Sequence, residues 1–207
     1  MRHAALAITI AIAAMPAAAT EEPRFETLRR SGDIELRLYA PMIVAETFVQ
    51  GDLSRASGDG FRVIAGYIFG DNESVRGTGS EKVAMTAPVT MEPASGKIAM
   101  TAPVIVEADA AGGYRMHFVM PSAYTLETLP RPRDARVRLR EVPAQRMAVV
   151  RFSGFAGEDK VRERTTELLD WVRSEGLQPA GPPQLARYDP PWTLPFLRRN
   201  EVMVPLD

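Results

Sequence analysis

The segment Lys82-Val-Ala-Met-Thr-Ala-Pro-Val89 recurs almost letter for letter, fifteen positions later, as Lys97-Ile-Ala-Met-Thr-Ala-Pro-Val104. Each copy alternates in the manner of a β-strand, and the connector contains Pro93 and Gly96, which favour a turn. Two copies are too few for a repeat array, so the pair predicts a β-hairpin. The residues that share one face are all apolar: Val83, Met85, Ala87, Val89 and Met91 in the first copy, and Ile98, Met100, Ala102, Val104 and Val106 in the second.

The two methionines at the centre of these faces, Met85 and Met100, have two interpretations. Thioether side chains adapt to irregular shapes, so the pair could line a deformable wall for a flat apolar ligand. Ordinary core packing explains the same alternation without any ligand. In either case the pattern predicts that both side chains point inward.

Outward from the repeat, the chain alternates strands with two helical segments. Apolar residues at helical spacing predict a helix over Leu53–Phe69, closed by Gly70, and a second over Glu158–Ser174, followed by Gly176. Strands are expected at 34–39, directly after Pro41, and at 83–91, 98–106, 114–120, 137–142, 147–152, 185–188 and 200–206. This order predicts an α+β fold in which two similar halves close one distorted antiparallel β-barrel of about eight strands.

The N-terminus indicates export. Arg2 and His3 precede an apolar run over Ala4–Met15, and small residues stand at Ala17 and Ala19. A run of this length is too short to span a membrane but is typical of a signal peptide, so residues 1–19 are expected to be removed after Ala19. The alternative is an apolar N-terminal helix that packs on the domain. The remaining residues, 20–207, fit a single domain.

Composition excludes several classes of function. The part after Ala19 carries 24 basic and 26 acidic residues, a balance that argues against nucleic-acid binding. The chain has no cysteine, which excludes disulfides, thiolate metal sites and covalently attached haem. His117 is the only histidine after position 19, so a histidine-based zinc centre is excluded. The sequence shows no nucleophile elbow, phosphate loop or dinucleotide fingerprint, and an enzyme is the least favoured interpretation.

Several further motifs follow one another along the chain. The Met-Thr-Ala-Pro-Val element follows a helix of the form Gly60-Phe61-x-x-x-x-x-Tyr67-Ile68-x-Gly70-x-Asn72. The later motifs are Met120-Pro-Ser-x-Tyr124-Thr-Leu-Glu-Thr-Leu-Pro130, Phe152-Ser-Gly154, Tyr188-Asp-Pro-Pro and Arg198-Arg-Asn-Glu-Val202. In these motifs and in their order, the chain resembles the SOUL family of haem-binding proteins over Phe25–Leu206.

The resemblance implies a two-helix barrel similar to the effector-binding domains of some transcriptional regulators, and non-catalytic, reversible binding of haem or porphyrins. It places the ligand against an apolar surface beside the first helix, which here carries Phe61, Arg62, Ala65, Gly66, Ile68 and Phe69. Arg198 and Arg199 are candidates for a second wall, because guanidinium groups suit the propionates of haem. Trp192, in a stiff proline-rich loop, either contacts the ligand or seals one end of the barrel.

One departure from the family concerns the iron ligand. Some members are described as ligating haem through a histidine in the early strands, and Tyr39–Gln50 contains none. His117 is the remaining candidate for the metal, but it alternates away from Met116 and Phe118, so its side chain is expected to face outward. A methionine or tyrosine is the alternative ligand, but nothing in the sequence singles one out. Haem is therefore expected to be held mainly by apolar contact and propionate pairing, without a strong axial bond, and His117 is expected to be dispensable.

The arginine-rich segment Arg131–Arg140 also has two interpretations, a patch for an anionic ligand or a solvated strand face, and alternation favours the second. The leading functional hypothesis is a monomeric, periplasmic or secreted carrier or buffer of haem or another tetrapyrrole, with no membrane span. The alternatives are a binder of other apolar small molecules on the same scaffold and a structural or protein-interaction module without a ligand.

Overall fold

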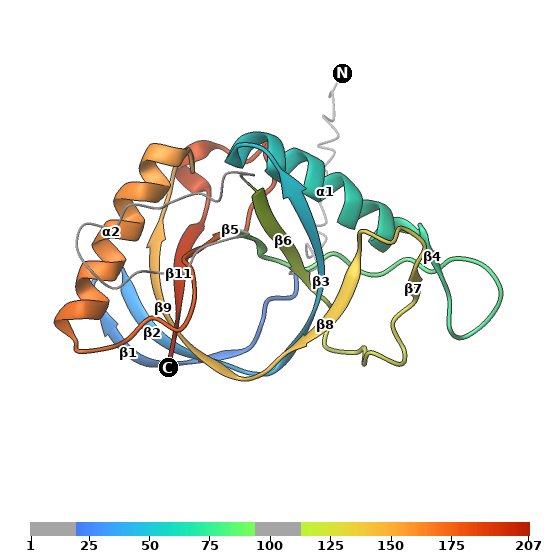
Figure 1. Ribbon diagram of the computed structural model, residues 1–207, viewed down its shortest axis with the longest axis horizontal. Coiled ribbons are helices and arrows are strands. Elements are labelled where there is room, and N and C mark those ends of the chain that lie inside the picture. Colours follow the sequence, from blue (N-terminus) through green and yellow to red (C-terminus); the bar gives the residue numbers. More distant parts are fainter. Residues whose placement is uncertain (1–19, 94–112) are drawn as a thin grey trace, which may run out of the picture.

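The computed structural model describes residues 20–93 and 113–207, which form one large sheet and two helices (Figure 1). The helices are α1 (Leu53–Phe69) and α2 (Glu158–Ser174), as the sequence predicts. The strands are β1 (Phe25–Ser31), β2 (Ile34–Tyr39), β3 (Met42–Gln50), β4 (Asn72–Glu73), β5 (Val89–Pro93), β6 (Gly113–Val119), β7 (Arg131–Pro132), β8 (Arg138–Val142), β9 (Gln145–Phe152), β10 (Gln184–Arg187) and β11 (Asn200–Leu206). A 3-10 helix spans Pro195–Leu197.

Nine strands form a single antiparallel sheet in the order β1-β2-β9-β11-β10-β5-β6-β3-β8, and β4 pairs separately with β7. Figure 1 shows that the sheet curls round on itself, with α1 along the top and α2 at the left. The α+β, barrel-like class predicted from the sequence is confirmed. Within the ranges that the structure describes, neither helix combines the length and the apolar character needed to span a bilayer.

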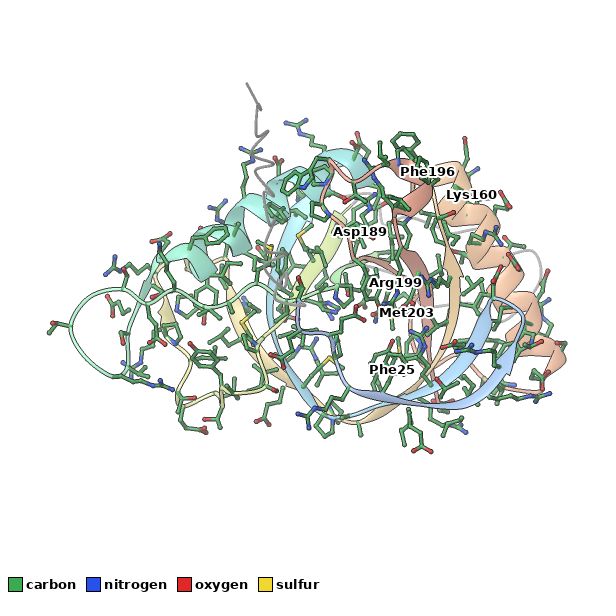
Figure 2. All side chains as sticks on the ribbon, turned by 180° about the vertical axis from the view of Figure 1, so that it is seen from behind. Phe25, Lys160, Asp189, Phe196, Arg199 and Met203 are labelled. Atoms are coloured by element: carbon green, nitrogen blue, oxygen red, sulfur yellow. The ribbon has the colours of Figure 1, made fainter. Side chains whose placement is uncertain are left out.

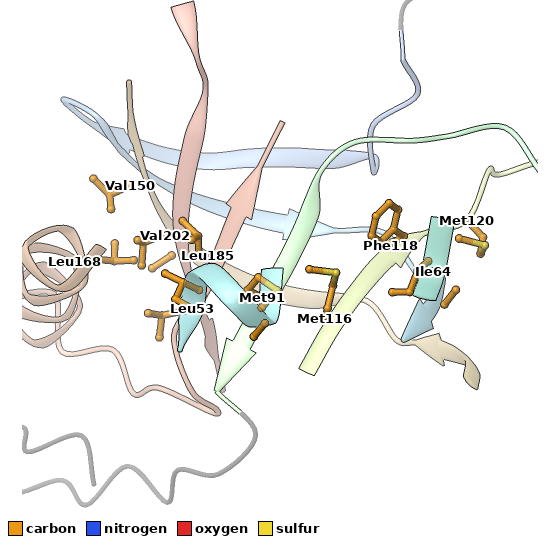
Figure 3. Close-up of a cluster of buried hydrophobic side chains, with 14 of the residues drawn as sticks. Leu53, Ile64, Met91, Met116, Phe118, Met120, Val150, Leu168, Leu185 and Val202 are labelled. Atoms are coloured by element: carbon orange, nitrogen blue, oxygen red, sulfur yellow. The ribbon is translucent and has the colours of Figure 1, made fainter. Parts of the chain in front are cut away.

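The helices cover one face of the sheet, called here the helix face. Figure 3 shows Leu53 and Ile64 of α1 and Leu168 of α2 among sheet residues such as Met116 and Val202. Side chains at alternate strand positions point to the opposite side, called the second face, where a smaller cluster forms around Met147 and Met203.

Local signals explain where α1 begins and ends. The Asp52 side chain accepts a hydrogen bond from the Arg55 N–H at 2.8 Å, which caps the first turn. Gly70 follows the last turn with a φ of 126°, a conformation that glycine adopts without strain. Gly60 has a packing role, because a Cβ atom built there would lie 2.9 Å from Met116 Sδ. A glycine therefore lets α1 approach β6 closely.

The first copy of the repeat differs from its prediction. A strand over Val83–Met91 is wrong, because β5 begins only at Val89. Pro88 has no N–H for a strand ladder, and the residues before it bond elsewhere: Thr86 Oγ1 donates to Val119 O, and Ala87 N donates to Glu21 O at 3.0 Å. Val83, Ala87 and Met91 are buried, but the expectation that Met85 points inward is wrong, since 40% of it is exposed. The second copy, including Met100, lies outside the described residues, as do residues 1–19.

Strand β1 is absent from the sequence-based prediction. It pairs with β2 at the edge of the sheet, and every one of its residues is exposed. A strand without a buried face has no reason to alternate apolar and polar residues, so its sequence carries no period-two signal.

The close approach of α1 to β6 gives a test of the packing. We expect Gly60→Ala to lower the free energy of unfolding by about 1 to 3 kcal/mol, because the added methyl group overpacks against Met116. The matched control is Gly58→Ala, two positions earlier in the same helix, where a Cβ atom meets nothing within 4 Å. This control should raise stability by up to about 1 kcal/mol through helix propensity. Urea unfolding measures both, and equal effects would contradict the packing role.

Candidate ligand-binding site on the outer side of helix α1

An apolar line runs along the exposed side of α1. Phe61, Ala65 and Phe69 follow one another at four-residue spacing, which places them in one row on the helix; we call this row the α1 stripe. Phe69 is 57% exposed and Phe61 is exposed at its edge, while the Phe61 ring packs on Phe118 with centroids 5.6 Å apart. The stripe therefore presents aromatic surface to solvent from a firmly packed helix.

The exposed Met85 lies in the segment that runs beside the end of α1. The backbone N–H of Val83 donates to the Ile68 carbonyl at 2.8 Å, which ties this segment to the last turn of the helix. Ile68 itself is buried in the core, so it supports the surface and does not contact a ligand. Of the predicted α1 residues, Phe61, Arg62, Gly66 and Phe69 reach the surface, whereas Ala65 and Ile68 are buried.

A wide groove of about 1240 Å³ follows the other flank of α1. Its floor combines apolar residues with small ones, and its rim is charged. The residues that line it are Phe48, Val49, Gln50, Gly51, Arg55, Asp59, Arg62, Val63, Gly66, Asp71, Asp134 and Arg136. Arg136 belongs to the arginine-rich segment for which the sequence favoured a merely solvated face, and only the fold shows that it meets α1 here.

The charged rim is made of ion pairs. Arg62 pairs with Asp59 one turn earlier in the helix, and Arg136 binds Asp134 with Nη2–Oδ2 at 2.6 Å. The Asp134 pKa is lowered by the hydrogen bonds from Arg136. Because these pairs are exposed, each contributes little to stability and can be exchanged for another anion at low cost.

Arg62 lies between the stripe and the groove, one residue after Phe61 in the helix. A ligand whose apolar body lies on the stripe can bring a carboxylate to this guanidinium, whose fork matches a carboxylate. Among the described residues that line the groove, none carries an imidazole, a thiol or a thioether. The geometry therefore suits an apolar body with anionic substituents. The exposed Met85 thioether lies outside the groove, in the segment beside the end of α1.

The C-terminal candidates lie elsewhere. Trp192 is 82% exposed, in a loop that also exposes Leu194, Phe196 and Leu197. Arg198 is occupied within that loop: its Nε donates to the Thr193 carbonyl at 2.8 Å, and its guanidinium lies over the Phe155 ring. Figure 2 shows Phe196 at the upper edge of the molecule and Arg199 near its middle. None of Trp192, Arg198 and Arg199 lines the α1 groove.

Arg199 instead belongs to a buried network on the second face, centred on Glu201, which has no exposed surface. Arg37 binds both carboxylate oxygens of Glu201, at 2.9 and 3.1 Å, and Tyr188 donates its hydroxyl at 2.6 Å. Burial alone would raise the Glu201 pKa, but the bonds from Arg37 hold it below its usual value. The carboxylate is therefore ionised and fully used within the protein.

His117 also lies on the second face, since its neighbours Met116 and Phe118 belong to the helix face. As the sequence predicts, His117 points away from Met116 and Phe118; it is partly exposed, it lines a small cavity, and its Nδ1 is enclosed. Burial, together with the nearby Arg140 and Arg115, lowers the His117 pKa to about 4, so the ring is neutral at physiological pH. The whole sheet separates this imidazole from the α1 stripe.

Comparison with known proteins supports both the fold and the family. The model of the family described as SOUL heme-binding protein matches residues 20–96 and 92–205. Among curated proteins, no match is found.

Solved structures share the fold at low identity. The C-terminal domain of EcmrR is 14% identical, with a TM-score of 0.60, and the match covers 84% of this chain and 96% of that one. A hydrolase from Listeria innocua is 14% identical, with a TM-score of 0.55, over 87% of this chain and 94% of that one. An uncharacterized conserved protein from Listeria innocua is also 14% identical, with a TM-score of 0.57, and the match covers 84% of this chain and 92% of that one. Such identities show a common fold and transfer no activity.

The Glu201 network predicts a strong dependence of stability on one carboxylate. We expect Glu201→Gln to lower the free energy of unfolding by about 1 to 3 kcal/mol, because it removes the carboxylate that both terminal nitrogens of buried Arg37 bind and leaves Arg37 paired only with Glu35, through Nε. Because the folded-state pKa of Glu201 is lowered, its contribution is present above the usual carboxyl range and is lost as the pH falls through that lower pKa. The variant should lack this part of the acid dependence.

The control for this test is Glu163→Gln, which removes an exposed carboxylate paired with Lys160 in α2 and should change stability by under about 0.5 kcal/mol. Urea unfolding at several pH values measures both variants. A loss of less than about 1 kcal/mol for Glu201→Gln would show that Arg37 finds another partner.

Proposed function

The chain belongs to the SOUL heme-binding protein family, and from this premise we propose that it binds haem or a related tetrapyrrole reversibly on the outer side of α1. The family is one of small-molecule binders, so the proposal is a non-catalytic role. The name hydrolase belongs to one distant structural relative and supports no reaction here.

The observation that carries the proposal is the combination of two exposed phenylalanines, Phe61 and Phe69, with an open groove along the same helix that is lined by three arginines and three aspartates. A tetrapyrrole is a flat apolar ring with carboxylates at one edge, and the α1 stripe with Arg62 offers both kinds of surface. The groove of about 1240 Å³ is large enough for a ligand of this size, since small-molecule sites typically measure about 300 to 1,000 Å³.

The way in which this surface would hold haem follows from its side chains. Apolar contact with Phe61 and Phe69 would provide most of the affinity, and Arg62 would orient the propionates in place of its present partner Asp59. The iron supplies its own redox and ligation chemistry when haem is bound, but the groove lining offers it no imidazole or thioether. Binding without a strong protein ligand to iron is suited to pick-up and release, as a carrier or buffer requires.

We further propose that this role is exercised outside the cytoplasm, in the periplasm or after secretion. The support is the sequence of residues 1–19, in which a basic start, a short apolar run and small residues before Thr20 have the pattern of a cleaved signal peptide.

A second candidate is a binder of other apolar small molecules on the same surface. The stripe is apolar and offers no group that distinguishes iron, so a flat hydrophobic anion of another kind would find the same contacts. Titration with hemin separates the two candidates, because only a haem binder is expected to give a saturable shift of the Soret band at stoichiometric hemin.

The first test of this function uses Arg62. Titration of the protein from Thr20 onward with hemin should give a shifted, saturating Soret band, and Arg62→Ala should weaken binding by about three- to tenfold. The control is Arg173→Ala, because Arg173 is also an exposed helix arginine paired with an aspartate three positions earlier, Asp170. This control should bind hemin as the wild type does. Equal affinities for both variants, or no saturable shift in the wild type, would contradict the proposed site.

The second test separates contact from iron ligation. His117→Ala should leave the affinities for hemin and for iron-free protoporphyrin unchanged, because the imidazole lies on the opposite face of the sheet from α1. The two ligands should also bind the wild type with similar affinity. If His117→Ala abolishes hemin binding while protoporphyrin still binds, iron is ligated by His117 and the ligand lies on the second face.

A further inference from the structure

The second face contains a cavity of about 190 Å³ that the haem proposal does not use. It combines charged and thioether side chains. The residues that line it are Pro23, Tyr39, Met42, Pro88, Thr90, Glu92, Arg115, His117, Val119, Arg140, Val142, Gln145, Met147, Gln184 and Met203. The volume is below the range of about 300 to 1,000 Å³ usual for drug-sized ligands, so a tetrapyrrole does not fit. At about 30 Å³ per water molecule it matches roughly six waters, or one small organic molecule.

Two nitrogen atoms at this cavity lack partners. His117 Nδ1 and Arg115 Nε are both enclosed, and neither makes a hydrogen bond within residues 20–93 and 113–207. Another nitrogen of the same side chain, Arg115 Nη1, lies 3.9 Å from a carboxylate oxygen of Glu92. The guanidinium group lies over the Phe48 ring. Its Nε–H can only donate, so the partner that it lacks is a hydrogen-bond acceptor. A neutral imidazole can also donate from Nδ1 when that nitrogen carries the proton.

The unpartnered Arg115 Nε favours an anion over a cation. Two arginines and two glutamates lie near His117: Arg115 Nη1 is 3.9 Å from Glu92, and Arg140 Nε is 3.0 Å from Glu46. Their formal charges balance, so the preference comes from the enclosed Arg115 Nε–H, which can bond only to an acceptor. Burial is the main cause of the low His117 pKa, and Arg140 and Arg115 lower it further, the direction expected of nearby positive charge. Three methionines and a histidine line the same cavity, but an ammonium group has no lone pair that could accept from Arg115 Nε.

We propose that this cavity binds a small carboxylate with a short apolar chain, whose oxygens accept hydrogen bonds from His117 Nδ1 and Arg115 Nε. The chain would lie against Met42, Met147 and Met203, whose flexible thioethers adapt to a small apolar group. Tyr39 and Val142 complete the apolar wall. This site is separate from the α1 stripe, and its ligand differs from a tetrapyrrole in size.

The methionines themselves provide the measurement. In protein labelled with ¹³C at the methionine methyl groups, pentanoate should shift the resonances of Met42, Met147 and Met203 in a saturable way. Met91, Met116 and Met120 belong to the helix face and serve as internal controls whose resonances should not move. Single Met→Leu variants assign the six signals.

Two matched probes test the charge. Pentanamide has the same shape without the charge and should bind at least about tenfold more weakly than pentanoate, while pentylamine should leave the three resonances unchanged. The proposal is overturned if pentanoate shifts none of the three, or if pentanamide or pentylamine shifts them with equal affinity.

A variant tests the assigned donor. Arg115→Lys keeps the positive charge but removes the Nε–H, and it should weaken pentanoate binding by about fivefold or more. The control is Arg138→Lys on β8, which is separated from β6 by β3; the Arg138 side chain is exposed and does not line the cavity. Unchanged resonances of Met91 and Met116 show that the variant is folded. Pentanoate affinity equal to the wild type in Arg115→Lys would mean that the proposed contact is wrong.

Discussion

Glu201 is buried at the centre of the second face, and Arg37 binds both oxygens of its carboxylate. The two residues stand on β11 and β2, which are not neighbours, because β9 runs between them. A buried pair of this kind adds little net stability, because desolvation of the two charges offsets much of their attraction. It does disfavour any other strand register of the sheet, because one of the two charges would then be buried without its partner. Arg199 extends the network to Glu22, so the N-terminal segment is held against the same carboxylate. The curl of the sheet and the place where the chain enters it thus depend on one ionised group.

Alternation along β6 then separates the surfaces on which function depends. Met116 and Phe118 lie on the helix face, where Phe118 supports Phe61 of the α1 stripe. Arg115 and His117 point to the second face and line its cavity. A slip of one residue in this strand would exchange the two sets, placing charges in the core and apolar groups in the cavity. The same strand therefore carries the support of the proposed tetrapyrrole surface on one side and the proposed carboxylate site on the other.

The sequence predicts well what depends on local pattern. The bounds of α1 and α2 follow from helical periodicity and from caps such as Asp52 and Gly70, and β2 and β11 follow from alternation. The prediction is wrong where contacts with residues far away in the sequence determine the conformation of a segment. Thr86 and Ala87 bond to Val119 and Glu21, so the alternation of Val83–Met91 does not become a strand, and no local signal shows this.

In the candidate site, too, some residues could be predicted from the sequence, and others are brought there only by long-range contacts. The resemblance to the family implies Phe61, Ala65 and Phe69 of the row, but Arg136 reaches the groove beside α1 only through the fold of the chain. Alternation in β6 predicts that Arg115 and His117 point away from Met116 and Phe118, but it does not predict what they meet there. The side chains of Arg140 and Arg115 stay 41% and 31% exposed, while His117 Nδ1 is enclosed. Residues from several strands form the cavity on this face, so it could not be predicted from one strand.

The affinity of the α1 surface has to come mainly from apolar contact. Its arginines are exposed and already paired with Asp59 and Asp134, so exchanging one carboxylate for another gains little free energy. Burial of a flat ring on the stripe contributes about 25 cal/mol for each Å² of apolar surface removed from water. Ion pairing then orients the ring and selects ligands that carry an acidic edge. Because the groove lining provides no soft ligand, the iron adds little to this selection. The shape of the macrocycle and its carboxylates, more than its metal, therefore decide what this surface binds.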